Sequence, residues 1–543
     1  MEQAETSNAG KRPASIKDDI ISGFLVFLIA LPLCLGIAMA SGFPPIAGIL
    51  TAAVGGLVAT WIGSAPLTIK GPAAGLIVIA LGAVTELGAE GGNGYRKALA
   101  AIVVASVIQI LFALVRAGAL GDIFPSSVVH GMLAAIGVII CSKQIHVALG
   151  VKPEGKEPLH LLLEIPHSIG ELDPEITIIG AVSLGILFAM PLLAKKVEFV
   201  KKIPAPLIVL AVAVPLAHYF DLEHEHTYTF SLSHHAHKIG PSFLVNLPAS
   251  LLSAVTTPDF SAVLSGTSIK YIVMFSLVGS IESLLSAKAV DMLDPEKRRS
   301  DLDKDLLATG VGNLIAGFIG GLPMISEIVR SSANIGYGAK SKLSNFFHGL
   351  FLLLFVAFLP GLIHRIPLAA LAAMLIFTGI RLASPSEFTK TYKIGPEQLV
   401  IFLSTMIITI TTDLLIGVAA GLIIKMVIHL VNGVPVGGLF KPAIEERIEA
   451  DRVVLRVKHA AVFSNYLTIK KFIAKHAEAK LVVVDFDDAH LVDHTVMEKL
   501  HEQEEIFKRA GRKLELCGLD GHKGLSTHPL AARKKTATEA RAS

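Results

Sequence analysis

Charged side chains are scarce in this sequence of 543 residues: Asp, Glu, Lys and Arg make up 17%, whereas 52% of the residues are hydrophobic. Soluble domains carry about 25% charged residues, so the composition argues against a soluble enzyme. The net charge of +3 is small and no basic stripe accompanies it, which argues against a nucleic-acid partner. The composition indicates a membrane protein.

Cysteine is also scarce. Cys34, Cys141 and Cys517 lie far apart, so they form neither a disulfide framework nor a zinc motif, and we assign them a packing role. A histidine-rich segment at 221–243 could bind a metal ion or could be a solvated external loop. No Cys or acidic pairing fixes a ligand geometry there, so we predict no metal site and no cofactor.

The scarcity of charge is confined to the first four fifths of the chain. Residues 1–440 hold 58 charged side chains, or 13%, whereas residues 441–543 hold 35, or 34%. This step predicts a membrane domain followed by a small soluble domain. We place a cytoplasmic tail at 1–16, a transmembrane transport domain at 17–435, a soluble domain at 450–530 and a disordered tail at 531–543.

Apolar stretches of spanning length recur up to residue 431, and each predicts a membrane helix. Two further stretches, 66–88 and 321–338, are broken: each begins with a few extended residues and turns into a helix, near Gly71 and Pro72 in the first and near Ser326 in the second. Together they make fourteen segments of a polytopic α-helical membrane protein. The unbroken stretches are 20–40, 45–62, 97–115, 126–148, 174–194, 203–220, 269–290, 304–320, 343–361, 366–381, 397–412 and 413–431.

Lys and Arg residues in the loops predict the topology, because cytoplasmic loops near membrane ends are enriched in them. Lys11 and Lys17 precede the first span, and Lys297 and Arg298 lie in an even-numbered loop. The other even-numbered loops show the same bias. We therefore predict a multi-pass protein of the cell membrane with both termini in the cytoplasm and the loop 221–243 outside.

The two broken segments mark a candidate binding site. Irregular backbone at membrane depth is tolerated only inside protein or along a cavity, and paired breaks in the two halves of a chain are the best pointer to a transporter's site. A helix start presents free N–H groups and a partial positive charge, so two starts that meet favour an anion.

The first break contains Gly71, Pro72, Ala73 and Ala74. Pro72 suits the first turn of a helix, where its missing N–H costs nothing, and its small neighbours let a ligand approach the backbone. The alternative is a plain Gly-Pro kink in an ordinary helix. Lys70, beside the break, could contact an anion or anchor the segment at the interface.

The second break contains Ser326, Glu327 and Arg330. Ser326 is a potential N-cap, with Glu327 in the first helical turn. Arg330 could contact the substrate. Equally, it could pair with Glu327 three residues before it, which would lower the cost of both charges in the membrane.

Glu282 is the most informative single residue, because it lies in the middle of a span that is otherwise uncharged. An intramembrane carboxylate is a functional-site hypothesis by default; the alternative is a neutral carboxyl group hydrogen-bonded to a neighbouring helix. Ser286 lies one turn further along the same face. We predict that the two bind a coupling ion, H+ or Na+, since a cation would cancel the repulsion between the carboxylate and an anion.

Four sequence motifs resemble the SulP family of inorganic anion transporters. They are ALPLCLGIA at 30–38, PIAGILTAAVGGLVATWIGS at 45–64, GSIESLLS at 279–286, and GNLIAGFIGGLP followed by IVRSSAN within 312–334. The resemblance covers nearly the whole chain. It implies two inverted repeats of seven segments each, in which segments 3 and 10 are the half-helices.

The resemblance also implies which residues surround the anion, since substrate lies between the starts of segments 3 and 10, and segments 1 and 8 close the site. Leu33 and Ala47 replace a Gln and a Tyr of the family pattern, and Glu327 replaces a small or hydroxylated residue. Two acids in one site resemble nucleobase transporters of the same fold. The implied substrate-binding residues are Leu33, Ile37, Gly71, Pro72, Ala73, Ala74, Ser326, Glu327 and Arg330, beside the coupling pair of Glu282 and Ser286.

Residues 452–530 alternate strand-like runs with a charged amphipathic helix around 495–510, which predicts a small α/β domain. This domain resembles the STAS domain, which in SulP proteins follows the membrane domain, regulates it and supports a homodimer. The loop that STAS domains use for phosphorylation reads Asp493-His494-Thr495 here, so Thr495 is a candidate regulatory residue. A purely stabilising tail is the alternative.

The sequence leaves three functions open. The first is a secondary-active importer of sulfate or bicarbonate that works by alternating access. The second is a symporter of the same fold for nucleobases or for organic anions such as dicarboxylates, favoured by Glu327. The third is a membrane sensor or scaffold that conducts nothing, against which the broken helices and Glu282 count. An enzyme is not predicted, because no nucleophile and base or metal-ligand cluster lies among the spans.

Overall fold

The computed structural model of the chain describes residues 16–536, apart from 90, 156, 199, 201–202, 230–235, 248–252 and 450–451. The predicted tail at 1–16 therefore lies outside the described residues except for its last one. The chain divides into two compact units. The first consists of Met1–Gly118 and Ile139–Ile380, and the second of Ala119–Val138 and Arg381–Ser543.

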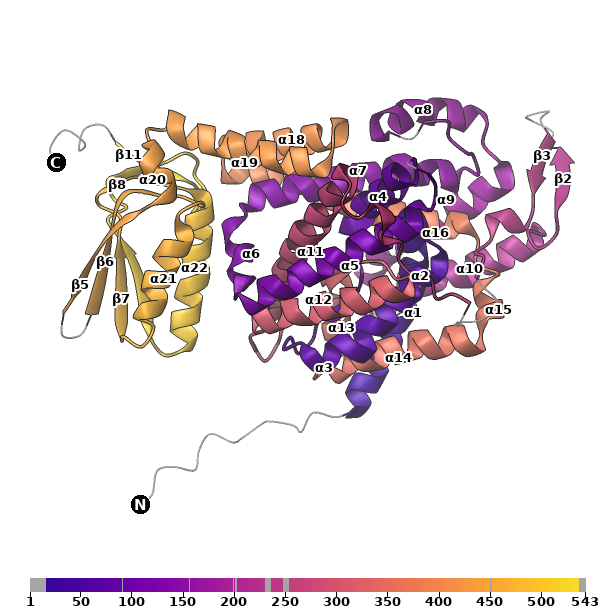
Figure 1. Cartoon of the computed structure of the whole chain (residues 1–543), viewed down its shortest axis with the longest axis horizontal. Coiled ribbons are helices and arrows are strands. Elements are labelled where there is room, and N and C mark those ends of the chain that lie inside the picture. The colour runs from indigo at the N-terminus through magenta and orange to yellow at the C-terminus, as the bar shows by residue number, and fades with distance from the viewer. Residues whose placement is uncertain are drawn as a thin grey trace, which may run out of the picture. The chain divides into compact units, whose positions relative to one another are not determined.

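Apolar helices account for most of the chain up to residue 431 (Figure 1). Each of the fourteen predicted segments coincides with one of them, the two broken segments as a strand followed by a helix. Among the described residues, eight helices are long and apolar enough to cross a membrane. In chain order the fourteen segments are α1 (Ile16–Ala40), α2 (Pro45–Val54) with its continuation to Ile62, α4 (Ile77–Ala89), α5 (Gly94–Leu114), α7 (Ser126–Ala148), α9 (Pro174–Ala194), α10 (Ala205–Tyr219), α11 (Gly266–Leu293), α12 (Leu302–Ile319), α13 (Ile328–Gly336), α14 (Leu343–Phe358), α16 (Leu368–Leu382), α18 (Pro396–Thr411) and α19 (Leu414–Val431).

Acidic residues set several of the helix starts, because a carboxylate that accepts hydrogen bonds from free backbone N–H groups stabilises the first turn. Asp173 accepts from two N–H groups at the start of α9, and Asp413 accepts from the N–H of Ile416 at the start of α19. An acidic residue at the end of a span can thus be explained by helix capping alone. Short helices connect the segments: α6 (Leu120–Ile123), α8 (Pro158–Gly170), α15 (Pro360–Ile363), α17 (Pro385–Ile394) and α20 (Val436–Phe440).

Small residues let helices of the first unit pack closely. The helix that starts at Pro45 has a π-helical turn at Gly55–Ala59, and Gly56 in this turn packs against Gly349 of α14. A Cβ atom at Gly56 would lie 2.6 Å from the backbone oxygen of Asn345 and 2.6 Å from the Cα of Gly349. Two helix backbones therefore touch here, as small residues allow in membrane proteins.

The two broken segments pair with each other. Strand β1 (Ile69–Pro72) runs antiparallel to β4 (Met324–Glu327), so each strand satisfies backbone groups of the other where lipid could not. A 3-10 turn (Ala74–Leu76) leads from β1 into α4, and α13 begins at Ile328 directly after β4. The antiparallel direction is what an inverted repeat requires.

The predicted helix starts lie too early in both broken segments. Pro72 ends a strand and does not occupy a first helical turn, and Ser326 lies inside β4 and is not an N-cap. Glu327 takes the N-cap position of α13, and its side chain does not cap the helix. The reason is the strand pairing, which keeps the two segments extended up to Pro72 and Glu327.

Among the described residues, the C-terminal part of the second unit is a seven-stranded sheet with two helices beside it (Figure 1). Strand β6 pairs in parallel with β7 and β8, and β7 pairs in parallel with β9. Helices α21 (Tyr466–Lys475) and α22 (His494–Arg509) bury apolar side chains against these strands, which confirms the predicted α/β domain. The strands are β5 (Ala443–Ile448), β6 (Arg452–Ala461), β7 (Leu481–Asp485), β8 (Ala489–Val492), β9 (Lys513–Cys517), β10 (His522–Gly524) and β11 (Arg533–Lys535).

The sheet extends beyond the predicted limits of 450–530 at both ends. Strand β5 begins at Ala443 and pairs antiparallel with β6, and β11 pairs with β8 and β10. The predicted disordered tail at 531–543 is therefore wrong for Arg533–Lys535, while residues 537–543 lie outside the described residues. Three basic residues have a low strand propensity, so the sequence does not reveal this strand.

We expect Gly56→Ala to destabilise the membrane domain, because its Cβ would force the π-helical turn and α14 apart. Overpacking of this kind costs about 1–3 kcal/mol. Gly185→Ala in α9 is the matched control, since a Cβ there meets nothing within 4 Å. Thermal unfolding of the purified protein in detergent should show a lower midpoint for Gly56→Ala alone. Equal midpoints for the two variants would contradict the close contact.

Candidate functional site

The pairing of β1 with β4 decides which side chains share a face. Lys70 lies opposite Ser326 in the register, and Gly71 lies opposite Ile325. Successive side chains of a strand point to opposite faces, so Ser326 and Glu327 do not face the same ligand. We call the paired strands β1 and β4 the strand crossing. It therefore has two faces, one with Lys70 and Ser326 and the other with Glu327.

Lys70 and Ser326 belong to a buried network with Asp305 of α12. The Lys70 Nζ atom lies 2.8 Å from Asp305 Oδ2 and donates to Ser326 Oγ at 2.9 Å. Ser326 Oγ also donates to Asp305 Oδ2 at 2.9 Å, and all three residues are buried. Lys70 is therefore neither an interfacial anchor nor a cation available to an anion. The Ser326 hydroxyl is bonded to both members of this ion pair, and its contact with substrate stays a prediction.

The network continues into α11 and along α12. The N–H of Ser326 donates to Ser283 Oγ at 3.1 Å, and Ser283 Oγ lies 3.2 Å from Thr309 Oγ1. Sequence reasoning misses Ser283, Thr309 and Asp305. Asp305 lies in the first turn of a predicted span, where an acid is ordinary, and its partner Lys70 is 235 positions away.

Arg330 of α13 lies against β1 and α1. Its Nη2 donates to the carbonyl oxygen of Pro72, and its Nη1 lies 3.4 Å from Cys34 Sγ. The residue is 1% exposed, and its Nε has no hydrogen-bond partner among the described residues. Within the described part of the chain, no ion pair joins Arg330 to Glu327, so the alternative of an ion pair across the second break is not realised.

Two glycines make room for charged side chains at the first break. A Cβ at Gly71 would lie 2.6 Å from Arg330 Nη1, and a Cβ at Gly75 would lie 1.9 Å from Glu282 Oε1. The small residues predicted to admit a ligand to the backbone thus admit Arg330 and Glu282. Arg330 of α13 thus packs against β1, and Glu282 of α11 packs against the turn that leads into α4.

Glu282 is half-buried in α11, and its Oε2 atom is enclosed without a hydrogen-bond partner among the described residues. Ser286, one turn further along α11, is buried and does not bond to that oxygen. A shared role of the pair in ion binding stays a prediction. An enclosed carboxylate oxygen without a donor is unfavourable, and a proton or a metal cation would satisfy it.

Glu327 lies half-buried beside the start of the opposite half-helix. The backbone N–H of Ala74 interacts with its carboxylate, and Ala74 opens the 3-10 turn that leads into α4. Ala73 is buried next to it. A carboxylate in this position offsets part of the partial positive charge of the helix start, which would otherwise attract an anion.

Helix α1 contacts Arg330 through Cys34, which is not one of the two residues predicted from the sequence, Leu33 and Ile37. Leu33 is half-buried and packs against the apolar cluster of α9, α10 and α16, and Ile37 is buried. The α1 residue that contacts Arg330 is Cys34, to which sequence reasoning assigns packing alone. Substrate contacts of Leu33 and Ile37 stay predictions.

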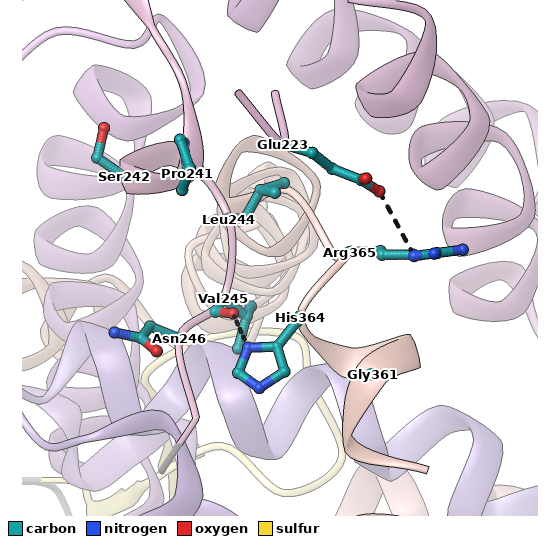
Figure 2. A pocket seen from close by; sticks show the side chains of 9 residues that line it. All are labelled: Glu223, Pro241, Ser242, Leu244, Val245, Asn246, Gly361, His364 and Arg365. Atoms are coloured by element: carbon teal, nitrogen blue, oxygen red, sulfur yellow. Dashed lines mark hydrogen bonds and ion pairs between the residues drawn. The ribbon is translucent and has the colours of Figure 1, made fainter. Parts of the chain in front are cut away.

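A cavity of 630 Å³ in the first unit has a different lining (Figure 2). Arg365 Nε lies 3.4 Å from Glu223 Oε1 with more than half of the arginine side chain exposed, and His364 Nδ1 lies 3.2 Å from the carbonyl oxygen of Val245. Its arginine is already paired and solvated, unlike Arg330, so we assign the candidate site to the strand crossing. The cavity is lined by Glu223, Pro241, Ser242, Leu244, Val245, Asn246, Gly361, His364 and Arg365.

Two other candidates from the sequence do not belong to the strand crossing. Thr495 lies in the second unit, at the second residue of α22, and is fully buried. The histidine-rich segment forms the hairpin of β2 (His226–Thr229) and β3 (Ala236–Ile239), and its residues 230–235 lie outside the described ones. Among the residues that the structure describes, no group of three or more His, Cys, Asp or Glu could hold a metal ion.

Comparison with known proteins yields a family and a fold. Residues 16–405 match the model of the sulfate permease family. The chain is 26% identical to the bicarbonate transporter BicA of Picosynechococcus sp. over 77% of its own length and 70% of that protein. It is 23% identical to the sodium-independent sulfate anion transporter of Bos taurus, over 93% of its own length and 84% of that protein. Its fold resembles that of the murine Solute Carrier 26 family member A9 anion transporter in the inward-facing state, with a TM-score of 0.65 and 14% identity over 95% of this chain and 90% of that one.

We expect Lys70→Met to destabilise the protein by about 3–5 kcal/mol, because it leaves Asp305 buried without its counter-charge. The double variant Lys70→Met with Asp305→Asn removes both charges and should recover most of the loss. Lys304→Met is the control, since that lysine is exposed and its pairing with Asp301 at 3.8 Å is a surface contact of little weight. Thermal unfolding measures all three, and a double variant no more stable than Lys70→Met would contradict the pairing.

Proposed function

The chain belongs to the sulfate permease family, and on that premise we propose that it is a secondary-active transporter that imports a small inorganic anion, sulfate or bicarbonate, by alternating access. It is a membrane protein of an anion-transporter family and not an enzyme. The observation that carries the proposal is the buried Arg330, whose Nε has no partner among the described residues.

Arg330 is suited to bind an oxyanion. Its guanidinium group stays charged and presents its donors in a planar fork that matches oxyanion geometry. Cys34 and the carbonyl oxygen of Pro72 each engage one of its two terminal nitrogens, and Nε, which has no partner among the described residues, is a further donor for substrate. The starts of α4 and α13 add partial positive charge on the same anion.

Glu282 is suited to couple the anion to a cation. Its carboxylate lies against Gly75 at the start of α4, so an ionised Glu282 repels an anion bound there. Binding of H+ or Na+ to its open oxygen removes this repulsion. Because such coupling is reciprocal, the cation then favours entry of the anion and the anion favours entry of the cation.

Glu327 favours a monovalent anion over a divalent one. With both acids ionised, Glu282, Glu327 and Arg330 together carry one net negative charge, and with a cation on Glu282 they are neutral. Bicarbonate then adds one negative charge and sulfate adds two, and excess charge costs more in a low-dielectric interior than in water. We therefore propose bicarbonate as the preferred substrate.

The proposed assembly is a homodimer with both termini in the cytoplasm. The orientation is supported by the enrichment of Lys and Arg in the even-numbered loops. The dimer is supported by the resemblance of the C-terminal domain to STAS domains.

Glu282→Gln should abolish cation-coupled uptake while the protein still reaches the membrane, because an amide neither takes up a proton near neutral pH nor attracts Na+ by charge. The measurement is radiotracer uptake into proteoliposomes, with sulfate compared with bicarbonate under imposed proton and sodium gradients. Glu171→Gln removes an exposed carboxylate and serves as the control. Normal, gradient-dependent uptake by Glu282→Gln would falsify the coupling role.

The same assay separates this function from its alternatives. Inhibition by uracil or by dicarboxylates, without uptake of either inorganic anion, would favour a nucleobase or organic-anion symporter. The absence of any uptake by a correctly folded protein would favour a sensor or scaffold.

Glu327→Gln should shift the substrate preference toward sulfate, because it removes one negative charge from the site. We expect the ratio of sulfate to bicarbonate uptake rates to rise by about tenfold or more, equivalent to about 1.4 kcal/mol. Both rates are measured in the same proteoliposomes, so differences in protein content cancel. An unchanged ratio would show that Glu327 does not set the preference for charge.

A further inference from the structure

Lys425 is a charged residue in the last apolar helix, α19, yet it is completely buried. It belongs to a stripe of buried residues four positions apart that also contains Gly417, Gly421 and His429, so all four lie on one face of the helix. The two glycines pack against α18. A lysine that snorkels to the membrane interface keeps its ammonium group in water, and Lys425 does not.

The partners of Lys425 come from the C-terminal domain of the same compact unit. Its Nζ donates to Thr495 Oγ1 at 2.6 Å and lies 3.3 Å from Asp493 Oδ2. It also lies 5.2 Å from the centre of the Phe463 ring, within the range of a cation–π contact. Lys425 and Thr495 are 0% exposed and Asp493 is 1% exposed. The ammonium group thus fills a closed pocket.

Asp493 organises this pocket. Its Oδ1 caps α22 by accepting from the N–H of Val496 at 2.7 Å, and its Oδ2 accepts from the N–H of Phe463 at 3.0 Å. His429 Nε2 lies 3.5 Å from the same Oδ2. Burial opposes ionisation of Asp493, but Lys425, His429 and these N–H groups outweigh it and hold its pKa below the ordinary value. The carboxylate is therefore available as the counter-charge of Lys425.

These two charges are compensated only while the C-terminal domain sits on α19, since a buried ammonium or carboxylate without a partner is strongly unfavourable. Other contacts of the domain within the unit are more exposed or uncharged. Lys470 Nζ lies 2.6 Å from Asp122 Oδ2 with a third of the lysine side chain exposed, and Ser526 Oγ donates to the carbonyl oxygen of Ile394. Asp122 itself is buried, so the Lys470 pair also helps to hold the domain, but the pair of Lys425 with Asp493 buries both of its charges.

We propose that Lys425 is the docking residue of the C-terminal domain: it inserts into a cation pocket formed by Asp493, Thr495 and Phe463 and fixes the start of α22 to the last membrane helix. The same contact encloses Thr495, whose hydroxyl oxygen accepts from Lys425. Thr495 is accordingly out of reach of a kinase while the domain is docked, and transfer of a phosphate group to it requires release of the domain first.

Hydrogen exchange of the full-length protein in detergent, read by mass spectrometry, tests the docking. We expect Lys425→Met to speed exchange at the start of α22 by about tenfold or more, because its first turn loses the cover of α19. Lys390→Met is the matched control, since Lys390 lies in the same unit with an exposed side chain paired to Glu387. Amides in β6 and β7 should stay protected in both variants, which distinguishes release of the domain from its unfolding.

Thiol labelling gives an independent measurement. The thiol of a Thr495→Cys variant should react slowly with a maleimide, and addition of Lys425→Met should raise its labelling rate by about tenfold or more. Peptide mass spectrometry separates position 495 from the exposed native Cys517. Equal exchange at α22 in Lys425→Met and Lys390→Met would overturn the proposal. Fast labelling of Thr495→Cys alone would also overturn it, whether or not Lys425→Met folds.

Discussion

Backbone hydrogen bonding inside the membrane is the constraint on which the rest of this structure depends. An extended segment cannot leave its N–H and C=O groups to lipid, and β1 finds its partner in β4. That pairing places Lys70 opposite Ser326 and within reach of Asp305, and it ends where the two half-helices begin. The site therefore exists because two short strands must satisfy each other.

The chain handles intramembrane charge in two ways. Lys70 with Asp305, and Lys425 with Asp493, are closed pairs in which each charge already has its counter-charge. Within the part of the chain that the structure describes, Asp305 Oδ1 also lacks a hydrogen-bond partner, but the charge of Asp305 is paired. Glu282 and Arg330 instead have no ion-pair partner among the described residues, and each keeps one polar atom without a hydrogen bond. The ion pairs hold structural elements together, whereas Glu282 and Arg330 each have a polar atom that could bind an ion. A charge within a span is thus informative about function only once its partners are known.

The sequence predicts the segments well, because apolar length is a local property and each of the fourteen stretches carries its own signal. It also points to Glu282, since a charge in the middle of a span is rare in lipid, and to Arg330, because it lies in the second broken segment. The register of β1 with β4 cannot be predicted, because four residues carry no periodic signal, and the helix starts predicted at Pro72 and Ser326 are therefore too early. Asp305 lies close to a helix end, where it resembles an ordinary capping charge until its distant partner is known.

The strands that build the site also decide when it can form. Lys70 and Ser326 are 256 positions apart, so β1 is synthesised long before its partner exists. Until the second half of the chain arrives, the polar groups of β1 must be covered by water, by lipid headgroups or by another protein, because hydrocarbon offers them no bonds. Insertion of the first helices and completion of the candidate site are therefore separate events. The candidate site needs both halves of the chain, because each half supplies one of its two strands.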